Sequence, residues 1–520
     1  MTINLVTILY ENAQINPDKP AIIHGKKRIT YKELAQDVRR CAGLLKKKGI
    51  MIGDRVLVFL PMSIELYTLL LALWHCGASA VFLDAWARKK RLEQAASIAK
   101  CKAFVGIYKS HILRIFFREI RRIPLKLSIR DFNSKHEYTG IPAITGLTEN
   151  DVALITFTTG STGIPKAVKR THGFLLAQHK ILTNHLNPDI NDIDLVTLPI
   201  FILTNLAVGI TSYIPLFNPA RPERVNALRL CDAVNTFGIR TTAGSPVIYE
   251  KMANHCITHS IRLKSLKKIF IGGAPVFPGL AIKILKAFPE TSVEIVYGST
   301  EAEPISAIKA YELVEKNKEV QREGLLVGKP VDAISVSIIP DIKGPVQVSD
   351  QKNFKKLCLS SGKVGEICAS GDHVLKEYFC NEEAQRQNKI VVGSTIWHRT
   401  NDAGYMGKNG NLYLMGRIKQ HFTHTGKTWY IFPLEECLTQ LSGVRLGTYL
   451  KINTVLAVII ERESNLIKND DVTRYCKEKE IPIPDIILFN RLPRDPRHNS
   501  KIDYDRLKIS IQKKINILKR

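Results

Sequence analysis

The sequence is poor in the features that mark a metal site, a disulfide scaffold or an exported chain. Its 520 residues include ten scattered cysteines with no CxxC pair, which favours a reduced, intracellular chain. His421 and His424 lie close together, but no cysteine or carboxylate cluster joins them, so we expect no metal site there. The N-terminus lacks the basic start and small-residue cleavage site of a signal peptide. We therefore expect a cytoplasmic protein.

The chain also lacks a long apolar run free of polar residues. Its most apolar stretch, residues 66–83, contains His75, Cys76, Gly77 and Ser79. A membrane-spanning helix needs about 20 predominantly apolar residues. The stretch therefore predicts a buried helix, a turn and a strand rather than a membrane span.

Acidic residues are scarce relative to basic ones. Asp and Glu total 48 against 75 Lys and Arg, a formal net charge of +27. Such an excess suits nucleic acid, anionic lipid or an acidic carrier protein, although solvated basic faces explain it equally well. Aromatic residues do not interleave with the basic runs as a base-stacking platform requires, so we expect no nucleic-acid partner. The basic, amphipathic run at 108–130 is compatible with peripheral membrane contact or with an ordinary surface helix.

Alternating strands and helices dominate the rest of the chain. Apolar segments such as 55–60, 152–157 and 268–273 read as strands, with helical spacing between them, which predicts an α/β fold with largely parallel sheets. Residues 340–365 read as hairpins and turns of a β-rich subregion. The length exceeds one compact core. We predict a large domain at 1–419 and a small, mobile α+β domain at 420–520.

The segment "TFTTGSTGIPK" (156–166) predicts an anion-binding loop between a strand and a helix. Two glycines, Gly160 and Gly163, allow the backbone to turn and point N–H groups at an anion. Hydroxyl donors and a cation surround them: Thr158, Thr159, Ser161, Thr162 and Lys166. No Gly-Lys-Ser/Thr ending closes the loop, so it is not a Walker motif.

With its companions, this loop resembles the signature of the adenylate-forming superfamily of acyl-CoA synthetases, luciferases and peptide-synthetase adenylation domains. Further motifs follow in the family's order and span nearly the whole chain: "TYKEL", "GDRV", "GGAP" (272–275), "YGSTE" (297–301), "GEI", "RTND" (399–402), "GRIKQ" (416–420) and "LPRDPRHNSKID" (492–503). The resemblance implies attack of a carboxylate on the α-phosphate of ATP, with Mg²⁺ present and pyrophosphate leaving.

The resemblance also assigns roles to individual residues. The 158–166 loop would hold the β- and γ-phosphates, Thr300 would contact the α-phosphate, and Glu301 would hold Mg²⁺, a hard cation suited to oxygen ligands. Lys501 would reach over the transferring phosphoryl group. The remaining nucleotide contacts would come from the adenine-lining Gly273, Ala274 and Pro275, from the stacking Tyr297 with its neighbours Gly298 and Ser299, and from the ribose-binding Asp402 and Arg417.

Four places depart from the family pattern. Asn401 and Ala167 replace glycines, and Gln420 stands at a hinge position that is usually acidic or lysine. Asn tolerates a left-handed backbone, so the turn at 401 should survive. The stretch 427–432 is longer than usual in a region that helps shape the path of the second substrate. This last departure leaves the acceptor open.

The substrate and acceptor are readable only in part. The segment 198–210 is apolar and carries no Asp or Glu, which favours an aliphatic or fatty acid over an amino acid, because an ammonium needs a counter-charge. We expect transfer of the acyl group to a thiol of coenzyme A or of an acidic acyl carrier protein. Two alternatives remain. The first is a β-lactone synthetase, because residues 297–306 and 497–503 resemble the β-lactone synthetases of bacterial olefin biosynthesis. The second is a catalytically silent nucleotide-binding relative.

Overall fold

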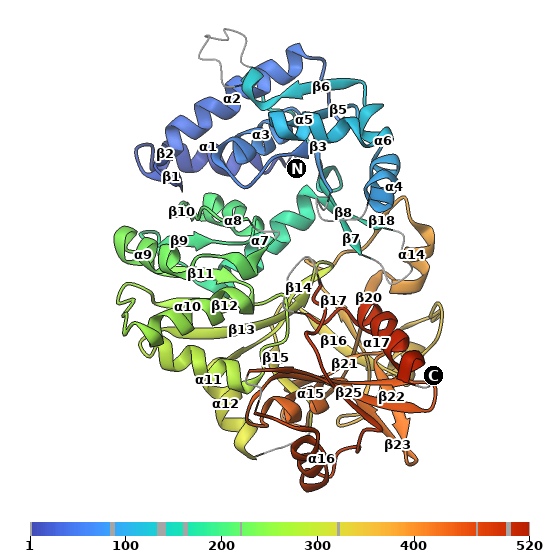
Figure 1. The fold of residues 1–520 in the computed structure, drawn as a ribbon. Helices are drawn as coiled ribbons and strands as arrows, with labels where there is room; N and C mark the ends of the chain where they lie inside the picture. The colour runs from blue at the N-terminus through green and yellow to red at the C-terminus, as the bar shows by residue number, and fades with distance from the viewer. Residues whose placement is uncertain are drawn as a thin grey trace.

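Figure 1 shows the fold in a computed structural model, which describes residues 3–83, 89–132, 142–159, 165–218, 221–319, 323–463, 466–495 and 501–518. A seven-stranded sheet in the order β18-β8-β7-β4-β3-β5-β6 organises the N-terminal part. Strands β3 to β7 pair in parallel, whereas β8 and β18 join antiparallel at one edge. The bounds are β3 (Arg55–Phe59), β4 (Ser79–Phe82), β5 (Ala103–Gly106), β6 (Leu125–Ser128), β7 (Val152–Thr159), β8 (Pro165–Thr171) and β18 (Tyr378–Phe379).

Helices pack this sheet against a second one. A single hydrophobic cluster joins Val56 of β3, the apolar helix α3 and Ile22 of β1, so α3 lies in the core between the two sheets. The helices of this part are α1 (Val6–Ile15), α2 (Tyr31–Lys47), α3 (Ile64–His75), α4 (Lys89–Ala99), α5 (Tyr108–Ile115), α6 (Arg118–Arg121), η1 (Ile129–Phe132), α7 (His172–Leu186) and α8 (Ile200–Val208). The predicted buried helix, turn and strand at 66–83 are confirmed as α3, Gly77 and β4.

The second sheet has fourteen strands in two halves. One half, β12, β11, β9, β10 and β1, is parallel; beyond β13 the pairing becomes antiparallel. The bounds are β1 (Pro20–His24), β2 (Lys27–Thr30), β9 (Ile193–Val196), β10 (Thr211–Ile214), β11 (Thr241–Gly244), β12 (Lys268–Ile271), β13 (Ser292–Ser299), β14 (Ala302–Lys309), β15 (Leu325–Pro330), β16 (Ser335–Ile339), β17 (Gly365–Ser370), β19 (Lys389–Val392), β20 (Thr395–Met406) and β21 (Leu412–Arg417).

The helices of this sheet are η2 (Pro222–Arg224), α9 (Ala227–Phe237), α10 (Pro246–Thr258), α11 (Pro278–Ala287), α12 (Ala310–Glu319), α13 (Gln351–Leu357) and α14 (Glu382–Asn388). One local prediction is wrong. Residues 351–357 form a helix, α13, where hairpins were expected. Its N-cap Asp350 accepts a hydrogen bond from the Asn353 amide at 2.9 Å, which satisfies a donor of the first turn.

The C-terminal segment has hydrophobic clusters of its own, drawn only from residues after 420. It consists of β22 (His421–His424), β23 (Lys427–Tyr430), α15 (Ile431–Thr439), β24 (Val444–Ile452), β25 (Val455–Arg462), α16 (Asn469–Glu478), β26 (Ile486–Phe489) and α17 (Tyr504–Leu518). It touches the rest of the chain through the rings of Phe277 and Phe432, 6.0 Å apart, and through Glu250 and Arg445 at 3.9 Å. The predicted α/β class with a small C-terminal domain is confirmed.

Candidate active site

Strands β7 and β8 form the hairpin that carries the predicted anion-binding loop. Thr158 lies opposite Lys166 and Thr159 opposite Pro165 in the antiparallel register. The four residues predicted between them, Gly160, Ser161, Thr162 and Gly163, lie outside the described residues. Lys166 donates to Asn388 Oδ1 at 3.2 Å, and its ammonium lies 5.7 Å from the centre of the Tyr378 ring. Burial lowers the pKa of Lys166, and the Glu301 carboxylate opposes that shift.

Glu301 occupies the tight turn between β13 and β14. Tyr378 donates to Glu301 Oε1 at 3.1 Å, and the Leu375 amide donates to the Glu301 carbonyl at 2.7 Å. The neighbouring Thr300 carbonyl accepts from Arg170 Nη2 at 3.2 Å. The turn is thereby held from two sides, with its carboxylate near the charge of Lys166. A carboxylate fixed beside an anion loop suits a hard divalent cation such as Mg²⁺.

The backbone at Gly298, three positions before Glu301, leaves no room for a side chain. A Cβ added to Gly298 would lie 2.8 Å from the Ala302 carbonyl oxygen, where the register of β13 and β14 shifts. The adjacent Ser299 Oγ is buried and has no hydrogen-bond partner in the described part of the chain. A buried hydroxyl usually has a partner. The Ser299 hydroxyl is therefore available to a ligand oxygen.

Three more predicted residues meet at the end of β20 and β21. Asp402 and Arg417 face each other in register and form an ion pair at 3.1 Å, and Tyr297 donates to Asp402 Oδ2 at 2.8 Å. Burial and the Asp402 charge raise the pKa of Tyr297, and Asp402 likewise raises the pKa of Arg417. Tyr297, Asp402 and Arg417 therefore form one cluster, although Tyr297 is more than a hundred positions from the other two in the sequence.

The predicted adenine segment lies at the same edge. Gly273, Ala274 and Pro275 follow β12, which is the parallel neighbour of β13, so they come beside Tyr297 at the carboxyl ends of both strands. Gly273 has φ +84°, a left-handed conformation that favours glycine. Crevices beyond the carboxyl ends of parallel strands are where α/β proteins bind ligands.

Lys501 belongs to the C-terminal segment, just before α17. Its carbonyl accepts from the Asp495 amide at 2.8 Å, and Arg494 and Ile502 form an antiparallel bridge around it. The charge of Asp495 contributes to the raised pKa of Arg417, which places this short ladder near Asp402 and Arg417. Asp495, which pairs with Lys501 in this ladder, is therefore within electrostatic range of Arg417.

Asn401, which replaces the glycine of the family pattern, makes contacts within the candidate site. Asn401 has φ +60°, so the left-handed turn survives as predicted. Its side chain donates to Asn388 Oδ1 at 3.0 Å, and the same oxygen accepts from Lys166. Asn388 therefore connects the loop lysine to the turn before Asp402, a contact that a glycine at 401 would not make.

Sequence reasoning missed Tyr378 and Lys389, which lie near Glu301. Lys389 opens β19, is 4% exposed, and donates to the Leu375 carbonyl. Its ammonium lies 5.5 Å from the centre of the Tyr378 ring, which Lys166 also approaches. Burial lowers the pKa of Lys389 to about 7, and Glu301 opposes the shift. A lysine beginning the apolar run "KIVV" was the available signal for a buried cation.

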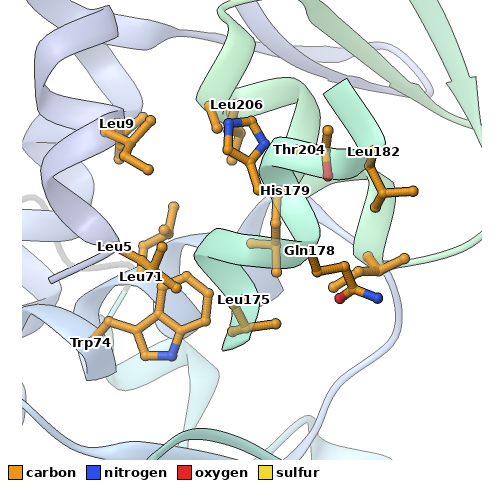
Figure 2. Close-up of a pocket in the computed structure, with 14 residues that line it drawn as sticks. Leu5, Leu9, Leu71, Trp74, Leu175, Gln178, His179, Leu182, Thr204 and Leu206 are labelled. Carbon is orange, nitrogen blue, oxygen red and sulfur yellow. The ribbon is translucent and has the colours of Figure 1, made fainter. Parts of the chain in front are cut away.

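An apolar pocket of about 40 Å³ lies among helices α1, α3, α7 and α8. Figure 2 shows Leu175 and His179 of α7 on the other side of the pocket from Leu9 and Trp74, whereas the amide of Gln178 points away from those two residues. The segment 198–210 supplies five of its lining residues: Ile200, Leu203, Thr204, Leu206 and Ala207. No Asp or Glu lines the pocket in the described part of the chain. Gln178 Nε2 lies 3.5 Å from the carbonyl oxygen of Glu303, two positions beyond Glu301.

An α/β fold with a small C-terminal domain, an anion-loop hairpin and a carboxylate turn defines an adenylate-forming enzyme that activates acids. A model of the AMP-binding enzyme family matches residues 9–379, so the chain belongs to that family.

Known proteins resemble the chain over almost its entire length. It is 27% identical to the olefin beta-lactone synthetase of Stenotrophomonas maltophilia, covering 97% of each chain. It is 29% identical to that of Xanthomonas campestris pv. campestris, covering 92% of this chain and 90% of the relative.

Solved structures share the fold. The amide bond synthetase McbA of Marinactinospora thermotolerans matches with a TM-score of 0.82 and 19% identity, covering 98% of this chain and 99% of that one. O-succinylbenzoate coenzyme A synthetase of Bacillus subtilis, in complex with ATP and magnesium ion, matches with a TM-score of 0.79 and 20% identity, covering 96% and 99%.

Proposed function

We propose that this enzyme uses ATP and Mg²⁺ to convert an aliphatic carboxylic acid to its acyl-AMP. The observation that carries the proposal is the apolar pocket, which has no acidic side chain among its lining residues and whose Gln178 contacts the Glu303 carbonyl, two positions beyond Glu301. An amino-acid substrate would bring an ammonium group to this pocket with no carboxylate to pair it, and burying an unpaired charge is costly. A hydrocarbon chain meets no such penalty.

In the proposed complex, each part of the nucleotide has a partner. The triphosphate lies on the 158–166 hairpin beside Lys166, Mg²⁺ is held by Glu301, and the ribose hydroxyls meet Asp402 and Arg417. The adenine lies between residues 273–275 and Tyr297. The fold relative solved with ATP and magnesium ion supports this arrangement.

The proposed chemistry is a displacement at phosphorus. A carboxylate oxygen of the acid attacks the α-phosphorus of ATP, the bond to the β-phosphate oxygen breaks, and pyrophosphate leaves with its electron pair. Both reactants are anions, so cationic groups are needed around the α-phosphate. Lys166 and Arg417 are already close to Glu301, and Lys501 lies on the adjoining ladder.

For the second step we propose transfer of the acyl group to a thiol of coenzyme A or of an acyl carrier protein. The thiol sulfur attacks the acyl carbonyl and AMP leaves. The coenzyme A synthetase among the fold relatives supports a thiol acceptor. Carrier proteins are commonly acidic, and a net charge of +27 suits such a partner. All ten cysteines are free, which fits our proposal of a reducing, cytoplasmic setting.

A second candidate for this step is β-lactone closure of a 3-hydroxy acid. The two relatives named olefin beta-lactone synthetases favour it. So does Gln178, which is 5% exposed and whose Oε1 has no partner among the described residues. Because its Nε2 faces the Glu303 carbonyl, Oε1 is an acceptor directed elsewhere, suited to a substrate hydroxyl. That hydroxyl would lose its proton and attack the acyl carbonyl, releasing AMP.

Product analysis separates the two candidates. The enzyme is incubated with ATP, Mg²⁺ and matched pairs of plain and 3-hydroxy fatty acids, with and without coenzyme A or a carrier protein, and products are identified by mass spectrometry. Thioesters from plain acids, with no lactone from hydroxy acids, support the thiol proposal. A β-lactone and AMP formed without any thiol support the second candidate. If no acid gives AMP, the chain is best explained as a catalytically silent relative.

A further inference from the structure

Helix α5 presents its apolar side to solvent. Five large side chains within nine positions are exposed: Tyr108 at 70%, Ile112 at 44%, Leu113 at 48%, Ile115 at 55% and Phe116 at 64%. A surface helix of a globular protein normally turns its apolar stripe toward the core. Isolated exposed apolar residues are common, but a contiguous group of this kind marks an interaction site.

Polar contacts fix this orientation. The buried Ser110 donates from Oγ to the Phe59 carbonyl at 2.8 Å, and His111 Nε2 lies 3.1 Å from the Leu127 carbonyl. The His111 ring also packs edge-on against Phe104, with ring centres 5.1 Å apart. The hydrogen-bonding side of α5 therefore faces the sheet, and the apolar side cannot turn inward without breaking these bonds.

Basic residues flank the exposed apolar side chains in the sequence and on neighbouring helices. The segment 108–130 holds seven lysine and arginine residues against one glutamate, Glu119, which pairs with Arg122 at 3.0 Å. Helix α4, which packs on α6, begins with two exposed lysines and an arginine, Lys89, Lys90 and Arg91. The Glu93 carboxylate of α4 accepts hydrogen bonds from the backbone amides of Arg118 and Glu119 at 2.6 and 2.7 Å, so it caps the start of α6. The local charge is positive.

We propose that α5 and α6 form a docking surface for an anionic lipid bilayer, with the apolar side of α5 at the boundary between head groups and acyl chains. Apolar side chains flanked by cations are typical of interfacial helices, which gain both burial and attraction to anionic lipid. The described residues contain no helix long and apolar enough to cross a membrane. The proposal rests on these side chains alone and does not depend on the acid that the enzyme activates.

A bilayer fits this surface better than an acidic carrier protein. A carrier must deliver its thiol to the acyl-AMP, near Glu301 and Lys501. Figure 1 shows α5 and α6 in the N-terminal part of the molecule, at the opposite end from the C-terminal segment that carries Lys501. A flat lipid surface needs no such proximity to the reacting atoms.

Vesicle co-sedimentation of the full chain tests the proposal. Vesicles of phosphatidylcholine alone are compared with vesicles in which part of it is replaced by phosphatidylglycerol, at physiological salt. The apolar variant carries Ile112→Ser, Leu113→Ser and Phe116→Ser. The matched control carries Ile282→Ser, Leu466→Ser and Ile509→Ser, which are 52%, 84% and 62% exposed on other elements. A third variant carries Arg118→Gln, Arg121→Gln and Lys126→Gln, and thermal melts verify that all three fold.

We expect the wild-type chain and the control to sediment with anionic vesicles and only weakly with neutral ones. The apolar variant should lose at least tenfold in partition coefficient, and the charge variant should lose its preference for anionic lipid. Absence of binding to anionic vesicles would overturn the proposal. So would binding that survives the apolar substitutions, since net charge alone would then explain it, or an apolar variant that keeps lipid binding but loses binding to an acidic carrier protein.

Discussion

The two halves of the candidate site are built in opposite ways. On the nucleotide side, Lys166, Glu301, Asp402 and Arg417 come from different elements, and each is held by a named partner. On the proposed acid side, leucines of α1, α7 and α8 surround a pocket from which Gln178 contacts the Glu303 carbonyl. Charged ligands need fixed, directional partners, whereas a hydrocarbon needs only volume. Under the proposed function, the chemistry is set on the polar side and the choice of acid on the apolar side.

The largest effect should follow from Lys501→Ala, on the polar side. Negative charge redistributes over the α-phosphate as pyrophosphate departs, and a positioned cation stabilises that state more than bound ATP. Loss of one such group typically costs about 10²–10³ in rate. We expect a fall of that order in ATP–pyrophosphate exchange, measured with saturating acid.

The exposed Lys508→Ala on α17 is the control for lost positive charge. If the C-terminal segment rotates away after the first step, transfer from pre-made acyl-AMP should survive Lys501→Ala nearly intact. A variant that adenylates at the wild-type rate would show that Lys501 is an ordinary solvated lysine.

A charge placed on the apolar side should have the next largest effect. Leu203→Asp puts a carboxylate into the pocket wall, and disturbed apolar contacts typically change specificity by roughly 10–200-fold. We expect kcat/KM for an aliphatic acid to fall within that range while KM for ATP stays unchanged. Leu228→Asp, at a 48% exposed position of α9, is the matched control. Equal losses for ATP and acid would mean that the two halves are not separable.

Gln178→Leu tests whether the apolar side recognises a hydroxyl group of the substrate acid. An unmade hydrogen bond to a buried acceptor costs about 1–3 kcal/mol, so a site that uses Oε1 should prefer 3-hydroxy acids by roughly tenfold over plain acids. We expect the substitution to remove that preference and leave plain acids nearly unaffected. The ratio of kcat/KM for a matched acid pair is the measurement. An unchanged ratio would leave Gln178 with a packing role only.

The last prediction concerns Lys389, whose substitution is expected to change stability rather than the adenylation rate. Its pKa is lowered to about 7 by burial, so between about pH 7 and its ordinary value the unfolded chain binds a proton that the folded chain does not. Stability therefore rises with pH across this window through Lys389. Lys389→Met should be most stabilising below pH 7 and lose that advantage toward pH 10, in urea unfolding at several pH values. The exposed Lys408→Met should show no such trend.

The sequence predicted strands and motifs better than it predicted contacts. The apolar segments 55–60 and 268–273, predicted as strands, contain β3 and β12. Helix α13 was missed because its polar, weakly periodic sequence resembles a turn region. The contacts of Lys389 and Tyr378 with the Glu301 turn depend on strand order, which brings β18 beside β8 and places β19 next to β20. No local pattern encodes that order.

ATP–pyrophosphate exchange over a panel of acids is the measurement that tests the central claim most directly. The panel pairs aliphatic acids of increasing chain length with amino acids of similar size, under saturating ATP and Mg²⁺. The account predicts strong exchange with medium or long aliphatic acids and very little with any amino acid. Robust exchange with amino acids and none with aliphatic acids would contradict it.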